Sequence, residues 1–187
     1  MNSEWEKFSE AALAGNFCSP GEWRVCANDA ASPDRAPWNP KVRRFFEYWM
    51  SISPAGRLPG RQHFDPLHIA PIMPNVWMLD VVREDALPRF RYRLVGTREV
   101  ATLQREVTGQ WFDEVHPEPA NNPIYARFAY IMDNRVGTYR KGPVGLTHHE
   151  DHHIVENCMV PFSSDGAAVD MIGICSILFY RNGAEVT

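Results

Sequence analysis

Potential metal ligands are concentrated in residues 148–153, whose sequence is HHEDHH. If this run formed a helix, His148 and His152 would share one side and His149 and His153 another, a spacing that suits a divalent metal. If it formed a strand, alternate residues of the run would share one side. The run lies between a Gly-Pro pair and an apolar stretch, where a solvated loop is expected, and a histidine-rich composition alone is weak evidence for a metal. Two interpretations stay open: a metal site made by these four histidines, and a solvated loop with a pH response at about pH 6.

A second group of polar side chains is a row of arginines. Residues 89–94 alternate between arginine and apolar side chains, which predicts a strand with Arg89, Arg91 and Arg93 on one face. Such a face is most often solvated and paired with acidic residues on neighbouring strands. Arg93 could instead bind a ligand carboxylate or phosphate, because a guanidinium group holds such anions through two hydrogen bonds. A structural pair between Arg93 and Asp80 across a hairpin is the alternative.

Aromatic residues form a third group, drawn from the expected sheet and from the helices that should face it. A large aromatic set is more often plain core than a ligand cage. Any cavity between sheet and helices would nevertheless lie among these side chains. We therefore predict a ligand site formed by Trp77, Tyr92, Arg93, Trp111, Phe112, Tyr125 and Phe128.

The composition describes one globular domain. The chain has 187 residues, of which 44% are hydrophobic and 22% charged, so it can bury a core. The net charge of -4, from 19 Lys+Arg against 23 Asp+Glu, argues against a dedicated nucleic-acid-binding protein. We see no apolar run long enough to cross a membrane, and residues 1–14 are too acidic and too interrupted for a secretory signal. We therefore expect a cytoplasmic protein without membrane insertion.

The cysteines and the short motifs do not indicate an enzyme. Cys18, Cys26, Cys158 and Cys175 form no CxxC pair, which argues against a zinc ribbon or a thioredoxin-type centre. The sequence also has no signature of a phosphate-binding loop, a zinc protease or a serine hydrolase. We therefore predict no catalytic residues.

The hydrophobic pattern predicts helices first and then strands on both sides of a helical region. Residues 3–15 and 40–53 are expected to be helices, with Asn39 as the cap of the second, and a short helix follows Asp65. The remaining elements are strands 76–82 and 89–96, short helical segments, helix 123–134, and strands 136–141, 153–162 and 167–180. This order gives five antiparallel strands with helices on one face. The last strand is apolar at odd and even positions, so its second face should be covered too.

This order of elements resembles the PAS fold. Residues 108–118, TGQWFDEVHPE, are similar to a motif in the helical half of PAS domains. The chain resembles most closely the short single-domain PAS-like proteins of alphaproteobacteria. The matching landmarks are Phe64-Asp65-Pro66, Pro74, Leu79-Asp80-Val81, residues 90–97 (FRYRLVGT), Thr108-Gly109, Pro161-Phe162, Asp165-Gly166 and Val169-Asp170. The resemblance extends over about residues 40–180.

The resemblance implies an α+β fold with a PAS-like five-stranded antiparallel sheet and helices on one face. The hydrophobic pattern adds an N-terminal helical extension, which lies outside the resemblance. Residues 1–39 would be a helix and an irregular extension, and residues 40–187 the PAS-like domain with its leading amphipathic helix. The implied function is a non-enzymatic sensory or regulatory module that binds a small ligand, a protein partner or both in signal transduction. Because too little sequence remains for an output domain, a separate signalling protein should receive the signal.

The sequence lacks the residues that PAS relatives use to hold or activate two cofactors, flavin and haem. Flavin–cysteine photochemistry needs a reactive cysteine in an Asn-Cys-Arg-Phe-type motif, which this sequence does not contain. Haem-binding relatives commonly use an axial histidine on the long helix before the third strand, and residues 123–134 contain no histidine. His116 is a remote substitute for that ligand. We expect neither cofactor.

The helix at residues 40–53 predicts a homodimer. PAS relatives commonly dimerise through helices that precede the core, and this helix carries Phe45, Phe46 and Trp49 on one stripe. Aromatic residues are enriched at protein interfaces. The alternative is a monomer in which the helix folds back onto its own sheet. Burial of each large apolar side chain contributes roughly 1.5–3 kcal/mol in either arrangement, so energetics does not choose between them.

Two other functions stay open. A small cone-shaped α+β enzyme of the isomerase or dehydratase type would also place an apolar pocket between helices and a sheet. It would need an acid–base residue in that pocket, for which Asp80 and Asp170 are the candidates. A buried, unpaired carboxylate with a raised pKa would favour such an enzyme. A ligand-free interaction adaptor would instead fill the cavity with its own side chains.

Overall fold

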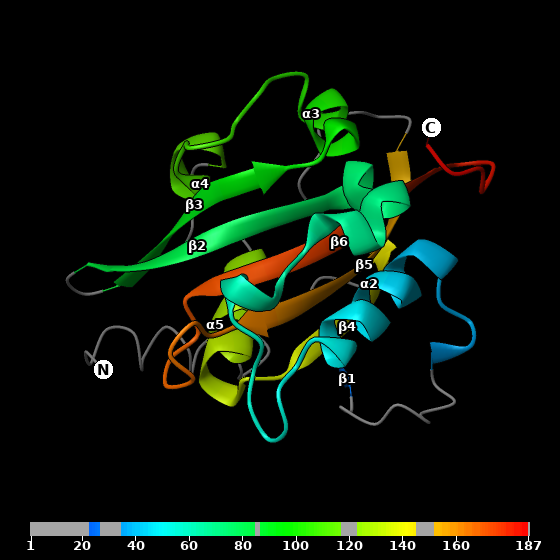
Figure 1. Cartoon of the computed structure of the whole chain (residues 1–187). Helices are drawn as coiled ribbons and strands as arrows, with labels where there is room; N and C mark the ends of the chain where they lie inside the picture. The colour runs from blue at the N-terminus through cyan, green and yellow to red at the C-terminus, as the bar shows by residue number, and fades with distance from the viewer. Residues whose placement is uncertain (1–22, 27–34, 85–86, 117–122, 145–151, 187) are drawn as a thin grey trace.

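The computed structural model describes residues 23–26, 35–84, 87–116, 123–144 and 152–186 (Figure 1). These residues form a six-stranded antiparallel sheet in the order β1-β4-β5-β6-β2-β3. The strands are β1 (Arg24–Cys26), β2 (Val76–Glu84), β3 (Leu87–Val95), β4 (Gly137–Pro143), β5 (His152–Phe162) and β6 (Met171–Tyr180). The predicted strands are β2 to β6. The additional strand β1 pairs with β4 at the sheet edge and comes from the segment predicted to be irregular.

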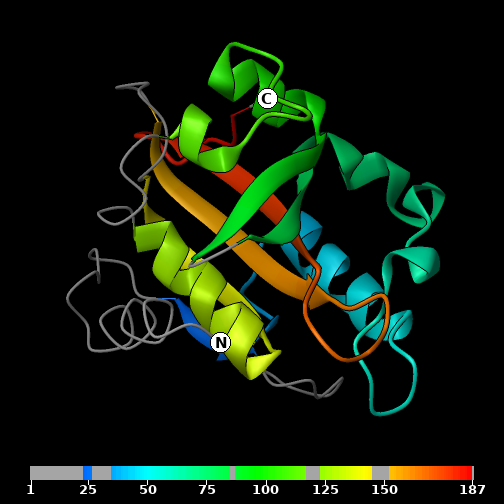
Figure 2. The same cartoon turned by 90° about the vertical axis from the view of Figure 1, so that its left-hand side faces the viewer.

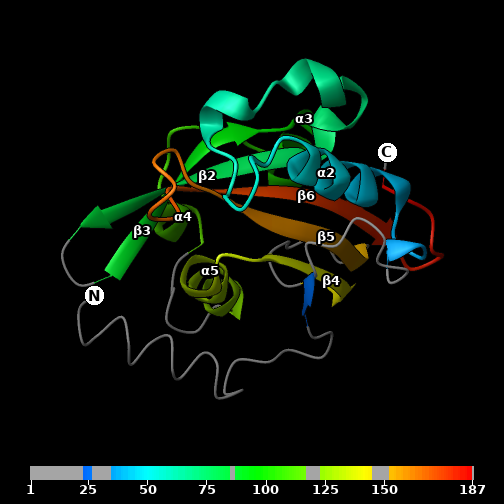
Figure 3. The same ribbon diagram turned by 60° about the horizontal axis from the view of Figure 1, so that its bottom comes forward.

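Helices cover both faces of the sheet. The α-helices are α2 (Pro40–Ser51), α3 (Thr97–Leu103), α4 (Phe112–Val115) and α5 (Pro123–Asn134), and the 3-10 helices are η2 (Arg61–His63) and η3 (Pro66–Asn75). In Figure 3, α2 lies on one face of the sheet and α5 on the other. Figures 1 and 2 show α3 and α4 beside β3, at one side of the sheet. The expected cover of the second face is therefore present, and α2 provides it. No helix within the described residues is long and apolar enough to span a membrane.

Helix α2 begins and packs as its sequence predicts. The Asn39 side chain accepts a hydrogen bond of 2.9 Å from the Lys41 backbone N–H, and Pro40 occupies the first turn. The apolar stripe turns toward the sheet, where the Trp49 indole N–H donates a 2.8 Å hydrogen bond to the Pro161 carbonyl oxygen of β5. The cap and the apolar stripe together fix both the start of α2 and the face that it buries.

Two glycines of the sheet make room for α2. A Cβ atom at Gly137 of β4 would lie 2.7 Å from the Phe46 ring, and one at Gly173 of β6 would lie 3.1 Å from the Phe45 ring. The two rings therefore pack directly against sheet backbone, and Phe45, Phe46 and Trp49 are only 0%, 0% and 2% exposed. The prediction that these three side chains form a dimer contact is wrong, because the chain's own sheet already covers them. Homodimerisation through other residues stays a prediction.

Replacing Phe46 with alanine should lower the free energy of unfolding by about 3–5 kcal/mol, the usual effect of removing a fully buried aromatic ring. Urea denaturation measures this difference. Glu47→Ala is the matched control on the exposed side of the same helix, where its 3.9 Å ion pair with Arg43 should contribute less than about 1 kcal/mol. Equal effects of the two substitutions would contradict the packing of α2 on the sheet. A Phe46→Ala protein that stays as stable as the wild type but changes from a dimer to a monomer in sedimentation would also contradict it.

Candidate ligand-binding site

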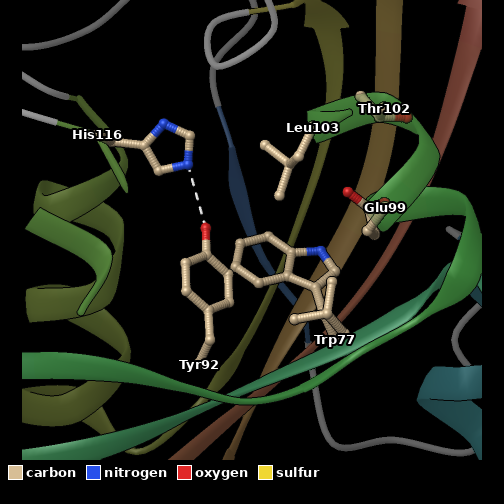
Figure 4. Close-up of a pocket in the computed structure, with 7 residues that line it drawn as sticks. Trp77, Tyr92, Glu99, Thr102, Leu103 and His116 are labelled. Atoms are coloured by element: carbon tan, nitrogen blue, oxygen red, sulfur yellow. Dashed lines mark hydrogen bonds between the residues drawn. The ribbon is translucent and has the colours of Figure 1, made fainter. Parts of the chain in front are cut away.

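A small cavity lies between the sheet and α3 (Figure 4). Residues from β2, β3, α3 and the end of α4 line it: Trp77, Tyr92, Val95, Glu99, Thr102, Leu103 and His116. Its volume is about 40 Å³, whereas a cavity needs about 10–15 Å³ to hold one water molecule. The cavity therefore suits water or a molecule with very few heavy atoms.

Helix α3 supplies one wall of the cavity, and a glycine sets its position. Glu99, Thr102 and Leu103 have the i, i+3, i+4 spacing that places side chains on one helical face. The helix starts after Gly96, whose N–H donates a 2.8 Å hydrogen bond to the Val76 carbonyl oxygen of β2. A Cβ atom at Gly96 would lie 2.3 Å from the Pro74 carbonyl oxygen. Because any larger residue would collide with backbone, Gly96 allows α3 to start this close to η3.

Tyr92 and His116 form a polar pair at one side of the cavity. The Tyr92 hydroxyl oxygen and His116 Nε2 share a hydrogen bond of 3.1 Å, and both residues are buried (Figure 4). Burial raises the pKa of Tyr92 far above its ordinary value, and the negative charge of Glu99 raises it further. Tyr92 therefore stays a neutral hydroxyl that can take part in hydrogen bonds.

Glu99 is the acidic residue of the cavity wall. Within the described residues, its carboxyl group has neither an ion pair nor a hydrogen bond, although it lines the cavity from a partly buried position. Burial raises the pKa of this carboxyl group from its ordinary 4.5 to about 8. Burial disfavours the carboxylate because it removes part of the water that would solvate the charge. A group with a pKa near neutrality can exchange a proton or bind a charged ligand.

The C-terminal tail connects α3 to α2. Arg98 of α3 donates a 3.2 Å hydrogen bond from Nη1 to the Val186 carbonyl oxygen. The adjacent residue, Glu185, forms an ion pair with Lys41 and accepts a 3.5 Å hydrogen bond from the Asn39 side chain. The helix that carries Glu99 is therefore linked through two neighbouring tail residues to the start of α2.

A comparison of the sequence with family models identifies the family of the chain, and the result agrees with the α+β fold described above. The family model of the PAS domain matches residues 37–176, which include α2 and most of the sheet. The chain belongs to the PAS family. PAS domains are in general sensory or regulatory modules, so the chain is such a module at this level of description. A search of curated proteins finds no match.

Only part of the predicted ligand site of this PAS domain lies at the cavity. Trp77 and Tyr92 line it. Phe112, Tyr125 and Phe128 instead pack with one another and with Phe90; the ring centroids of Phe90 and Phe128 are 4.7 Å apart, and those of Phe112 and Phe128 are 5.4 Å apart. These rings fill the space between the sheet and α5, which makes them core side chains.

The predicted row of arginines is engaged in ion pairs. Arg93 Nη1 lies 3.1 Å from an Asp80 carboxylate oxygen, and Arg91 Nη2 lies 3.3 Å from the same carboxylate. The pair that we kept as the structural alternative for Arg93 is thus present in the PAS domain. The Arg89 guanidinium carbon lies 4.1 Å from the ring centroid of Trp111, a cation–π contact outside the cavity. Neither Arg93 nor Trp111 lines the cavity.

The predicted metal ligands and acid–base candidates do not meet at the cavity. His148 and His149 lie outside the described residues, His152 begins β5, and His153 is exposed. No group of three or more potential metal ligands occurs among the described residues. Asp80 is paired with arginines, as stated above. Asp170 accepts a 2.9 Å hydrogen bond from the Ser164 N–H.

Sequence reasoning missed Glu99, Thr102 and Leu103, and it considered His116 only as a haem ligand. A glutamate in a short helix usually faces water, so Glu99 carried no signal by itself. Its spacing to Leu103 was the available clue, because a carboxylate on the apolar face of a helix is unusual. The position of that face, however, depends on the contact between Gly96 and η3, which is tertiary.

The pKa of Glu99 predicts a pH-dependent stability. The folded value of about 8 lies above the ordinary 4.5, so folding favours the protonated carboxyl group. This contribution is complete below about pH 4.5 and is lost as the pH rises through about 8. Relative to Glu99→Gln, the wild-type free energy of unfolding should fall by up to about 1.4 kcal/mol per pH unit in this interval.

Urea denaturation at several pH values measures this slope. Glu47→Gln on the exposed side of α2 is the matched control, and its pH profile should follow that of the wild type. Parallel profiles for wild type and Glu99→Gln would show that the Glu99 carboxyl group is not enclosed.

Proposed function

We propose that this PAS domain is a non-enzymatic sensor that binds a small polar molecule in the cavity beside Glu99 and reports its presence to a separate signalling protein. The observation that carries this proposal is the partly buried carboxyl group of Glu99, which lines the cavity without an ion pair or a hydrogen bond to any described residue. A polar group buried without a partner reduces stability. A ligand that supplies the missing partner would recover that stability, which is the requirement for a ligand-dependent change.

The contacts of α3 provide a route from the cavity to the surface. A shift of α3 on ligand binding would act on η3 through the close contact at Gly96, and on α2 through Arg98 and the C-terminal tail. Helix η3 carries Leu67, a large apolar side chain that is 79% exposed. This outer surface, formed by η3 and α2, is where we propose that a second copy or the signalling partner binds.

Glu99 also favours a second candidate function, an acid–base enzyme. A general base works best when its pKa is near the working pH, and the pKa of about 8 meets this condition. The PAS family favours the sensor, and Tyr92 and His116 already bind each other. The two functions differ in what happens to the bound molecule: a sensor releases it unchanged, whereas an enzyme converts it.

Native mass spectrometry of the whole chain tests the sensor. The protein is incubated with the small-molecule fraction of a cell extract, and any bound molecule is released and identified. We expect a bound small molecule that is released unchanged after prolonged incubation. Leu103→Phe, which adds volume inside the cavity, should abolish the bound mass, whereas Ala101→Leu on the exposed side of α3 should retain it.

Three results would contradict the sensor. Binding that survives Leu103→Phe would place the ligand elsewhere in the molecule. A released product that differs from the added molecule would support the enzyme. If the wild type binds no molecule and the Leu103→Phe protein is as stable as the wild type, the results would support an adaptor without a ligand.

A further inference from the structure

The chemical class of the ligand can be inferred from the groups around the cavity, on the basis of the function proposed above. The lining residues include Glu99, Thr102 and Tyr92, which carry a carboxyl group and two hydroxyl groups. Among the described residues, no lysine or arginine lines the cavity. His116 also lines the cavity, but its Nε2 shares a hydrogen bond with the Tyr92 hydroxyl, so Glu99 is left as the group that seeks a partner. The complementary ligand carries a positive charge and N–H donors.

Trp77 provides a second feature that suits a cation. Its indole N–H donates a 3.1 Å hydrogen bond to the Ser176 hydroxyl, and its ring stacks on Phe112 with an interplanar angle of 5°. These contacts fix the ring orientation. Figure 4 shows Trp77 between Tyr92 and Glu99. The face of an indole ring attracts a cation, most strongly where water is excluded.

The size and the remaining walls limit the ligand further. A volume of about 40 Å³ suits a ligand with few heavy atoms. Val95 and Leu103 give the cavity an apolar part, which suits a methyl group next to the charge. A ligand with one nitrogen atom and one carbon atom satisfies both parts of the cavity.

The geometry points to a small alkylammonium cation, of the size of methylammonium, bound between the Glu99 carboxylate and the Trp77 ring with its methyl group toward Leu103. The ammonium group supplies the hydrogen-bond donors and the charge that Glu99 lacks. Because the carboxylate is the binding form, a cation that binds to the protonated protein displaces the Glu99 proton into solution.

This exchange of proton for cation makes the affinity depend on pH. With the Glu99 pKa at about 8, the affinity for methylammonium should be about 50-fold higher at about pH 8 than at about pH 6. Tyr92 and His116 face the same cavity, and the exposed Arg105 lies close enough to act on Tyr92. Glu99→Gln leaves these groups in place, so it isolates the contribution of the carboxylate.

Titration of the 15N-labelled whole chain with methylammonium chloride tests the inference, because the Trp77 indole N–H signal reports on the cavity directly. Sodium chloride at equal concentration is the control for salt. A ligand of two heavy atoms binds at best in the millimolar range. We expect a saturable shift of the Trp77 signal, at least tenfold weaker binding in Glu99→Gln, unchanged binding in Glu47→Gln, and no binding in Leu103→Phe.

Methanol and formate, which are neutral and anionic molecules of similar size, separate the possible failures. If methanol or formate binds as well as methylammonium, the inference is wrong while the sensor proposal stands. If ammonium binds as tightly as methylammonium, the methyl contact is wrong. If methylammonium binds equally at the two pH values or to Glu99→Gln, Glu99 is not its partner. If none of these molecules binds and the cell-extract experiment also finds none, the sensor proposal fails as well.

Discussion

The sheet of this PAS domain is apolar on both faces, and the need to cover both faces determines the rest of the structure. Every residue from Met171 to Leu178 of the central strand β6 is buried. Helix α2 covers one face by placing aromatic rings over Gly137 and Gly173, and α5 covers the other with the cluster around Phe128. The chain thus provides both covers itself. A second copy is not needed to complete the core.

The same packing explains where the candidate site lies. Large aromatic rings fill the layer between the sheet and α5, whereas α3 is a short helix beside β3. The α3 wall carries Glu99 and Thr102 in addition to Leu103, so the space beneath it is small and partly polar. Because α3 is fixed to η3 at Gly96 and to the C-terminal tail at Arg98, a ligand in this space would act on elements that reach the opposite face of the sheet.

Local signals in the sequence predicted much of this fold. The apolar stripe and the Asn39 cap located α2, the alternation after Arg89 located β3, and the unbroken apolar pattern of the last strand predicted a cover on both faces. Two features were beyond such signals. Strand β1 has only three residues and depends on pairing with β4, and α2 could bury its stripe equally well against its own sheet or a second copy.

The site was less predictable than the fold, because it depends on where the packed side chains leave a cavity between the sheet and the helices. Sequence patterns place Trp77, Tyr92 and Phe112 on the same side of the sheet, but they do not show that Phe112 joins the core whereas the other two line a cavity. The sequence around Glu99 is that of an ordinary helical glutamate. The burial of its side chain comes from the position of α3 in the fold, which the neighbouring residues in the sequence do not indicate. The Arg93–Asp80 pair, in contrast, could be considered in advance because both residues lie on one predicted hairpin.

The central claim is that the partly buried Glu99 carboxyl group has no partner among the described residues and is available to a cation. Carbon-13 NMR of the side-chain carboxyl groups, with Glu99→Gln used to assign the signal, follows the titration of this group directly. The account predicts a midpoint at about pH 8 in the free protein and a lower midpoint when methylammonium saturates the cavity. A midpoint near the ordinary 4.5 that methylammonium does not change would contradict it.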